Sequence, residues 1–440
     1  MIAVVAFAAP FVGSVEANRT VKDELTAALR RPSARRRISV TDLVNPRQAF
    51  FRWTRPDIQP SPDRRQSLLA GTGFHSQFGA AISTEEFVEQ FVEFEGIVGK
   101  IDIYEDMPLE LKTTAVVPEG AEAARPTYVD QLAMYCAMVG VPRGRLVVYG
   151  RGGPPQPVRL RAFAVEFADL DGIRAEMRRR RDALARALES GSPGDLPRCE
   201  WFGRGCDYHD ICGCEAAPPL ERVVAPGSVA LQPDPALESA LTARVRAAPA
   251  PAGLRLTDLV FPRRSAYARL SPAEGDAIDD AEARLQDMAR RGFRDALYDT
   301  LRFGVPGAFR TVPVRLRSLA DRVDTYHGIP TLLRVSSRFE MVERRRIPHA
   351  LGHHVDRLAF ACALLQAEMG RLIVYYERLG DKFMVYDLQF RDLPQIRAEA
   401  DRRLALLEAG APPDQLPPCP TWMVQFCRFA PGCGCGGVPA

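Results

Sequence analysis

Two carboxylates and a lysine follow one another at a spacing that could support phosphodiester chemistry. Asp102 closes a Gly99-x-x-Asp pattern, and Glu110 and Lys112 alternate within a strand-like segment. Residues two apart on a strand share a face, and Asp102 lies beside them if its strand pairs with the next. Converging carboxylates suit Mg²⁺ or Mn²⁺, and a neighbouring lysine can orient a water and offset charge on a phosphate. A surface hairpin with alternating charges is the alternative that this spacing leaves open.

Three more polar residues could complete such a site. His75 ends a Gly71-Thr-Gly-Phe-His stretch upstream of the strands, and imidazole is a competent Mn²⁺ ligand. Gln131 and Tyr135 stand four residues apart in a segment that reads as a helix, and so share one helix face. Each signal is weak by itself, because an isolated histidine is usually an ordinary hydrogen-bonded residue.

Eight of the ten cysteines fall in two tight groups. These groups are Cys199, Cys206, Cys212 and Cys214, and then Cys419, Cys427, Cys433 and Cys435. Such clusters in a long chain predict bound metal in a reducing compartment rather than a disulfide scaffold. We therefore expect a cytoplasmic protein.

The chain contains an internal duplication. The phrase Thr-Asp-Leu-Val-x-Pro-Arg ends at Arg47 and again at Arg263, and each copy closes with one cysteine group. Gly-Arg-Leu-Val-Val-Tyr149 is echoed by Gly-Arg-Leu-Ile-Val-Tyr375 in the same order. These landmarks predict an extension at 1–37, copy one at 38–215, a linker at 216–252 and copy two at 253–440.

The elements needed to position the copy-one residues can be read from its hydrophobic pattern. We expect strands at 94–98, 100–104, 109–113, 146–149 and 158–163. We expect helices at 21–29, from Thr41 or Asp42 to Trp53, and at 83–91, 128–138, 170–188 and 235–247. This alternation predicts an α/β fold of tandem domains, each a mixed sheet flanked by helices.

The ordered motifs resemble a known family. GxxxH, GxxD, Glu-x-Lys and QxxxY, followed by cysteines, resemble the RecB-type nuclease domain of the PD-(D/E)XK superfamily, in its iron–sulfur branch. That branch includes the CRISPR-associated Cas-four exonucleases, the AddB-type nucleases and the Dna-two helicase–nucleases. The absence of a GxxxxGK[ST] phosphate loop favours the stand-alone Cas-four type.

This resemblance assigns a role to each motif residue. It makes His75, Asp102 and Glu110 metal ligands and Lys112 the catalytic lysine, with Gln131 and Tyr135 orienting the site and contacting DNA. It also implies a metal-dependent exonuclease acting on single-stranded DNA ends, with CRISPR adaptation or DNA repair proteins as partners. A restriction-endonuclease-type fold would carry both copies.

One departure concerns the cysteines. The family places one cluster cysteine before an early Pro-Arg, where this chain has Asn45 and Phe261, and each copy instead has four cysteines at its end. The resemblance implies a 4Fe–4S cluster in each quartet, while four thiolates also suit zinc. Reduced cysteines packed in a core remain a third reading.

Copy two lacks the chemistry of copy one. Leu332 aligns with Glu110 and Arg334 with Lys112, while Asp324 keeps the place of Asp102. The remaining replacements are Arg357 for Gln131, Ala361 for Tyr135 and Ala296 for His75. Since leucine cannot ligate a metal, we expect copy two to be inactive.

Composition limits the alternatives. The 440 residues are 46% hydrophobic and 26% charged, which excludes a disordered or fibrous chain, and the net charge of +3 permits nucleic acid without requiring it. No apolar run reaches the length of a membrane span, so we expect no membrane partner. Two rivals to the nuclease remain: a non-catalytic DNA-binding scaffold of metal-stapled pseudo-nuclease domains, and a zinc-binding interaction module.

Overall fold

The chain forms two compact units in a computed structural model that describes residues 6–29, 37–114, 117–120, 123–151, 159–203, 205–225, 227–247, 253–270 and 281–420, and positions 423, 427, 429 and 435. One unit comprises Pro32–Ala248 and Asp280–Ala296, and the other comprises Met1–Arg31, Pro249–Asp279 and Leu297–Ala440. We call them the Lys112 unit and the Arg334 unit, after the residues that occupy one equivalent position.

The Lys112 unit is built on a six-stranded mixed sheet of order β2-β3-β4-β5-β6-β7. Its strands are β2 (Val88–Phe94), β3 (Ile97–Tyr104), β4 (Pro108–Thr114), β5 (Arg143–Gly150), β6 (Arg159–Phe167) and β7 (Val229–Pro233). All neighbours pair antiparallel except β4 and β5, which are parallel and joined through a helix, as a parallel crossover requires. The predicted α/β fold with a mixed sheet is confirmed at this level.

Helices cover both faces of this sheet. They are α2 (Val40–Val44), α3 (Pro46–Thr54), α4 (Pro62–Ile82), α5 (Pro126–Val139), α6 (Leu170–Ser190) and α7 (Pro235–Ala247). Leu109 and Leu111 of β4 pack in one core with Phe74 of α4, while Lys112 reaches Gln131 of α5 on the other side. The alternation along β4 thus assigns its apolar residues to α4 and its charged ones to α5.

The Arg334 unit repeats this architecture. Its sheet has the order β1-β12-β11-β10-β9-β8, again with a single parallel pair, β10 and β11. Its strands are β1 (Val12–Ala17), β8 (Phe309–Leu316), β9 (Leu319–Tyr326), β10 (Ile329–Ser336), β11 (Met369–Tyr376) and β12 (Phe383–Phe390). Its helices are α1 (Arg19–Leu29), α8 (Leu256–Val260), α9 (Pro262–Leu270), α12 (Ile347–Ala350), α13 (Gly352–Leu365) and α14 (Leu393–Glu408), while α11 (Ala281–Gly304) is divided between the two units.

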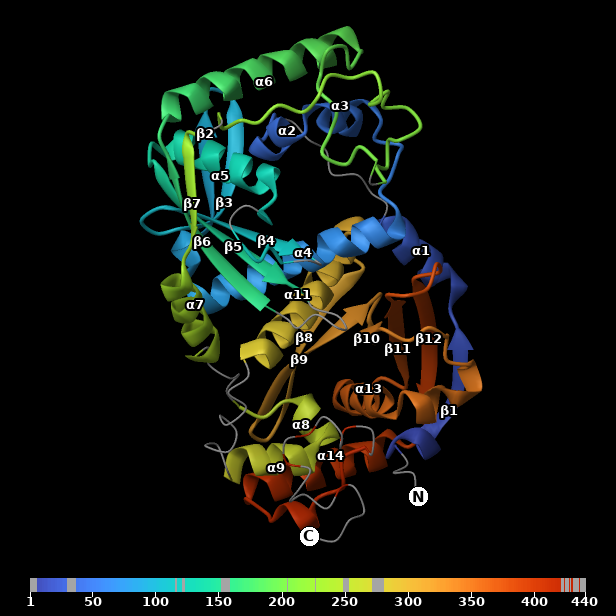
Figure 1. Cartoon of the computed structure of the whole chain (residues 1–440). Helices are drawn as coiled ribbons and strands as arrows, with labels where there is room; N and C mark the ends of the chain where they lie inside the picture. Colours follow the sequence, from blue (N-terminus) through green and yellow to red (C-terminus); the bar gives the residue numbers. More distant parts are fainter. Residues whose placement is uncertain are drawn as a thin grey trace. The chain divides into compact units, whose positions relative to one another are not determined.

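The segments expected to be an extension and a linker instead complete the two sheets. Strand β7, from the linker, pairs with β6, and strand β1, from the extension, pairs with β12, as Figure 1 shows for the blue and red strands. Each of these edge strands runs into a helix, α7 or α1. The duplication therefore also covers the start of the chain, and each unit receives its last strand from the beginning of the other repeat.

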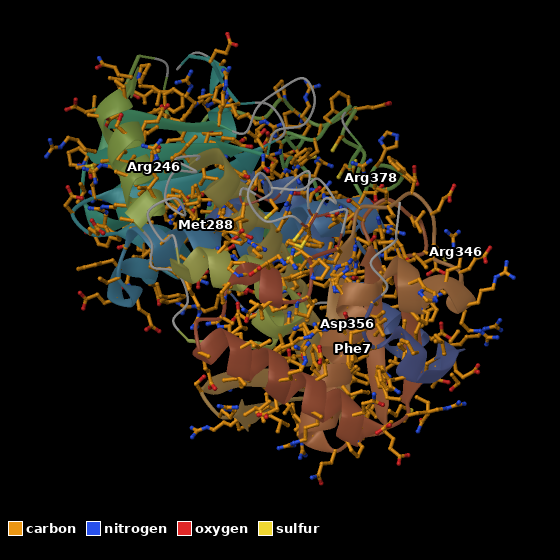
Figure 2. The ribbon with its side chains drawn as sticks, turned by 90° about the horizontal axis from the view of Figure 1, so that it is seen from below. Phe7, Arg246, Met288, Arg346, Asp356 and Arg378 are labelled. Carbon is orange, nitrogen blue, oxygen red and sulfur yellow. The ribbon has the colours of Figure 1, made fainter. Side chains whose placement is uncertain are left out.

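A buried aspartate on the central helix anchors each of these segments. In the Arg334 unit, Asp356 of α13 accepts hydrogen bonds from the backbone N–H groups of Phe7 (3.3 Å) and Ala8 (2.8 Å), and Figure 2 labels Phe7 and Asp356 side by side. In the Lys112 unit, Asp130 of α5 accepts two hydrogen bonds of 3.1 Å from Nε of Arg222. A backbone contact in one unit is a side-chain ion pair in the other.

Several predicted elements agree closely with the observed ones, and three do not. Residues 94–98 hold the turn between β2 and β3, with Glu95 and Gly96 at positive φ. The stretch 83–91, predicted to be helical, is a short 3-10 turn that leads into β2. The helix predicted to reach Trp53 breaks at Pro46 into α2 and α3, and Ser39 forms its capping box with Asp42. None of the described helices has the length and apolar character needed to cross a membrane.

Candidate active site

The candidate site lies where strands β3 and β4 separate. Their antiparallel pairing covers only Ile103 with Leu109 and Tyr104 with Pro108. Beyond this point, the backbone N–H of Leu111 donates to Oδ2 of Asp102 at 2.8 Å, so a carboxylate takes the place of a ladder carbonyl. The predicted hairpin is present, and its early separation leaves room for side chains between the two strands.

The residues predicted from the sequence come together at this point. Nδ1 of His75 lies 3.2 Å from Oδ1 of Asp102, and Nζ of Lys112 lies 2.5 Å from Oε1 of Glu110. Glu110 is only 2% exposed. Two carboxylates, an imidazole and an ammonium group from α4, β3 and β4 therefore share one largely buried location.

A hydrogen-bond chain runs from the lysine into α5. Nζ of Lys112 donates to Oε1 of Gln131 at 2.8 Å, and Nε2 of Gln131 donates to the hydroxyl of Tyr135 at 3.4 Å. Because the lysine can only donate, it fixes the orientation of the Gln131 amide. The i, i+4 pair on α5 thus acts as a support that positions the ammonium group.

The glycine of the GxxD pattern is needed for packing. A Cβ atom on Gly99 would lie 2.7 Å from Cε1 of Tyr135 and 3.1 Å from Cγ2 of Val92. The Tyr135 ring therefore occupies the space that a side chain at 99 would need. Gly99 and Tyr135, read from the sequence as parts of separate motifs, form one contact.

The charges of the site alter the pKa values of three members. Burial, reinforced by the charge of Asp102, raises the pKa of Glu110 despite the adjacent lysine. Burial also acts to raise the pKa of Asp102, but His75, Lys112 and the Leu111 N–H outweigh it, so that pKa is lowered. Burial opposes the charge on Lys112, but Glu110 and Asp102 prevail and raise its pKa. Lys112 thus stays protonated, and the two carboxylates differ in proton affinity.

One oxygen of the site has no partner. Oε2 of Glu110 is buried and accepts no hydrogen bond, although burial of such an atom costs free energy. As the side chains stand, no three Cys, His, Asp or Glu residues within the described ranges are grouped to hold a metal ion. Still, the orphaned oxygen and the hard donors beside it fit a divalent cation better than they fit a surface hairpin.

Helix α4, which carries His75, was not foreseen from the sequence. Ser61 caps it and Pro62 begins it, and it crosses α11 where Gly73 meets Gly292. A Cβ atom on Gly73 would lie 2.0 Å from the carbonyl oxygen of Gly292, so neither glycine can carry a side chain there. The Gly73-Phe74 step of α4 therefore packs directly against the Gly292-Phe293 step of α11.

Aromatic and basic side chains near Lys112 were also not identified from the sequence. Nζ of Lys112 lies 5.4 Å from the ring of Tyr128, and the guanidinium of Arg125 lies 5.6 Å from that ring and 5.8 Å from Trp201. Arg64 lies 5.0 Å from the Trp201 ring. The Arg-Pro-Thr-Tyr stretch ahead of QxxxY could have given the signal. We call Arg64, Arg125, Tyr128 and Trp201 the arginine–aromatic row.

The repeated Pro-Arg phrase holds the cysteine loop in place. Arg47 donates to the carbonyl oxygens of Gly194, Leu196 and Cys212, each at 2.8 Å. Asn45, at the position where the family has a cysteine, accepts a hydrogen bond from the N–H of Glu200. The equivalent Arg263 donates to Asp414 and Leu416 in the Arg334 unit.

The thiols of the first cysteine group interact with one another. Cys199 is hydrogen-bonded to Cys206, which raises the pKa of Cys199 and lowers that of Cys206, and the thiols of Cys212 and Cys214 are also paired. In the second group, the Cys419 N–H donates to Sγ of Cys435, whereas Cys433 lies outside the described residues. Cys136 and Cys362 are separate, and pack against Gly144 and Gly370 in the cores.

Comparisons with known proteins add little to this picture. No protein-family model and no curated protein matches the chain. A solved chain described as the crystal structure of SSO0001 is 20% identical, over 41% of this chain and 84% of its own length, with a TM-score of 0.28. At that level the likeness carries no conclusion, so the functional argument depends on the geometry described above.

Proposed function

We propose that the Lys112 unit is a metal-dependent nuclease that hydrolyses phosphodiester bonds in DNA. The observation that carries this proposal is the meeting of Asp102, Glu110 and Lys112 at the separating strands, with one buried Glu110 oxygen lacking a partner. A buried group of this kind is costly to maintain without a function.

The residues that would hold Mg²⁺ or Mn²⁺ are His75, Asp102 and Glu110. When bound, the ion supplies Lewis acidity toward the phosphate and lowers the pKa of a bound water. Lys112 stays protonated, so it acts as a fixed positive charge rather than as a general base. Gln131 holds that charge in place, and Tyr135 holds Gln131. The ammonium group can then orient the water and offset the charge that develops on the phosphate.

The arginine–aromatic row supports single-stranded DNA ends as the substrate. Unpaired bases can stack on Tyr128 and Trp201, while the flanking guanidinium groups meet phosphates. Such contacts read backbone and ring faces rather than base edges, so cleavage is blind to sequence. CRISPR adaptation or DNA repair is the setting that we propose for this activity, with proteins of those pathways as partners.

Each cysteine group would stabilise the terminal loop of its unit by binding a 4Fe–4S cluster or, alternatively, zinc. In the first group, this role is supported by two thiol pairs, Cys199 with Cys206 and Cys212 with Cys214, in a loop that Arg47 holds by a hydrogen bond. A metal held there would stabilise a loop with little core of its own. Iron, zinc and sulfide analysis after anaerobic purification distinguishes the two metal centres, and finding neither metal contradicts the assignment.

The decisive experiment is cleavage of end-labelled single strands with Mn²⁺ or Mg²⁺. We expect Glu110→Ala to abolish cleavage, while the matched variant Glu166→Ala, on an exposed position of β6, retains it. Undiminished cleavage by well-folded Glu110→Ala protein would disprove the site. DNA binding without cleavage by the wild-type chain would instead favour a non-catalytic scaffold.

A further inference from the structure

Basic side chains gather in the Arg334 unit around Arg334, which stands at the position of Lys112. Nη1 of Arg334, on β10, lies 3.3 Å from Nε2 of His353, and the rings of His353 and His354 at the start of α13 are 3.8 Å apart. The charge of Arg338 acts on Arg334 and both histidines, and the charge of Arg357 acts on His354. We call Arg334, Arg338, His353 and His354 the basic cluster.

Carboxylates do not balance the two arginines of this cluster. Leu332 replaces the glutamate, and Asp324 is engaged elsewhere, by Thr311 at 2.7 Å and Arg302 at 3.3 Å. In the described part of the chain, no carboxylate lies within ion-pair distance of Arg334 or Arg338. Like charges this close repel, so the ligand-free cluster is electrostatically unfavourable.

Two buried nitrogen atoms of the cluster also lack partners. Nε of Arg334 and Nε2 of His354 are both buried without a hydrogen bond. Burial, followed by the charge of Arg338, lowers the pKa of Arg334 to about 10. Burial, followed by Arg334 and Arg338, lowers the pKa of His353 to about 4. The guanidinium of Arg334 is thus kept buried without a counter-charge, and unfavourable arrangements of this kind are common at functional sites.

An anion would relieve both defects together. It would supply the missing negative charge and could accept hydrogen bonds from the arginines, whose planar guanidinium groups suit phosphate oxygens. Both histidines lie in the first turn of the 14-residue helix α13, where the helix dipole also favours negative charge. A phosphate group meets these requirements, and a divalent cation does not.

We propose that the basic cluster is a phosphate-binding site, and that the phosphate belongs to a nucleic-acid strand. The degenerate site has thus exchanged cation binding for anion binding at the same place in the fold. Phe339, which follows Arg338, is 70% exposed, and its ring lies 4.3 Å from the guanidinium of Arg378. That pair offers a stacking surface for a neighbouring base. The choice of a nucleic-acid strand rests on the proposed nuclease function, whereas phosphate binding does not.

The first measurement uses inorganic phosphate and the full chain without divalent metal, so its outcome does not depend on cleavage. We expect the unfolding midpoint to rise with phosphate concentration. Arg334→Met and, separately, the exposed-position variant Arg338→Met should each weaken phosphate binding at least about tenfold. The control Arg345→Met, in the same unit but paired with Glu343, should bind phosphate like wild type.

A second measurement separates the two sources of phosphate. A 5′-phosphorylated oligonucleotide should displace inorganic phosphate, and both variants of the cluster should weaken its binding more than that of a 5′-hydroxyl oligonucleotide. Displacement by neither oligonucleotide would overturn the strand as the source, leaving a free-phosphate site. Absence of phosphate binding, or equal binding by both variants and wild type, would overturn the site itself.

Discussion

The two units surround the same place of one fold with different sets of charged side chains. In the Lys112 unit, Asp102 and Glu110 meet one lysine. In the Arg334 unit, a leucine replaces the glutamate and arginine and histidine gather beside it. Strand pairing is short in both units, because β3 and β4 pair only as far as Ile103 with Leu109, and β9 and β10 only as far as Asp324 with Thr331. The opening between the strands is thus a property of the fold, while the side chains decide which ion it attracts.

What the units share is the framework that holds the opening in place. Arg180 of α6 donates to the carbonyl of Leu43 at 2.9 Å, and Arg403 of α14 donates to that of Leu259 at 2.8 Å. Gly144 and Gly370 each face a buried cysteine from the central helix. These contacts involve backbone carbonyls and packed side chains rather than reactive groups. The framework can therefore stay the same while the side chains at the opening change.

The largest expected effect comes from giving the Lys112 unit the residues of its counterpart. Glu110→Leu with Lys112→Arg should lower the rate of cleavage by at least about a thousandfold, because a metal ligand and the positioned ammonium group are both lost. Circular dichroism should show an unchanged fold, since the Arg334 unit accommodates the same pair. A rate within tenfold of wild type would break the comparison.

The reverse change should not restore chemistry. Leu332→Glu alone leaves Arg334 in place of the lysine and, as aligned from the sequence, Ala296 in place of the histidine, so we expect no additional cleavage in a chain already inactivated by Glu110→Ala. Cleavage by the Glu110→Ala, Leu332→Glu variant would show that adding one carboxylate is sufficient to activate the Arg334 unit.

A smaller effect concerns the aspartates that anchor the exchanged segments. Burial raises the pKa of Asp356 to about 6, although the N–H groups of Ala8 and Phe7 and the charge of Arg403 oppose this. Because the folded-state pKa exceeds the unfolded one, the folded chain takes up a proton between about pH 4 and 6. Stability therefore falls as pH rises through this range, by up to about 3 kcal/mol.

The measurement is the free energy of unfolding between pH 4 and 8 for wild type and Asp356→Asn. The asparagine cannot ionise, so the difference between the two curves should change across this window and level off above about pH 7. Parallel curves would mean that Asp356 keeps an ordinary carboxyl pKa.

A further prediction concerns the contact between Gly99 and Tyr135. Gly99→Ala should destabilise the Lys112 unit by about 1–3 kcal/mol, because its Cβ would overlap the tyrosine ring. Asp321 and Ala361 stand at these two positions in the Arg334 unit, where the small residue has moved to the helix. Adding Tyr135→Ala to Gly99→Ala should therefore recover part of the loss in denaturant unfolding. Strictly additive losses would show that the two positions do not interact.

The sequence predicted the residues of the candidate site better than it predicted the framework. Strand alternation was enough to place Glu110 beside Lys112, and helical spacing was enough to place Gln131 near Tyr135, because both are local regularities. Helix α4 was missed because Gly71 and Gly73 are poor helix formers, and Gly73 is explained only by its contact with Gly292. The edge strands β1 and β7 were missed because their partners are set by long-range pairing rather than by local pattern.

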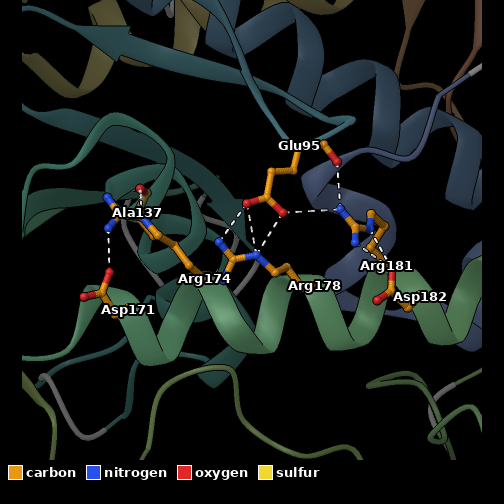
Figure 3. A network of polar contacts seen from close by, with 7 residues as sticks. All are labelled: Glu95, Ala137, Asp171, Arg174, Arg178, Arg181 and Asp182. Carbon is orange, nitrogen blue, oxygen red and sulfur yellow. Dashed lines mark hydrogen bonds and ion pairs between the residues drawn. The ribbon is translucent and has the colours of Figure 1, made fainter.

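The smallest effect concerns an exposed ion pair whose polarity is reversed between the units. Glu95, in the turn after β2, accepts from Nε and Nη2 of Arg178 on α6, and Figure 3 shows this fork with Arg181 beside it. At the equivalent turn, Arg317 lies 3.8 Å from Asp401 of α14. Glu95 and Arg317 both have positive φ, so the two residues share this backbone conformation while their charges are opposite.

Exposed ion pairs contribute little to stability, so Glu95→Arg should lower the unfolding midpoint by no more than about 2 °C. Adding Arg178→Asp reproduces the polarity of the Arg334 unit and should restore most of that shift, although Arg181 still faces the new arginine. The single variant's deficit should shrink in high salt, because the repulsion it introduces is between exposed charges. A larger, salt-independent loss in both variants would mean that Glu95 supports the turn by packing rather than by charge.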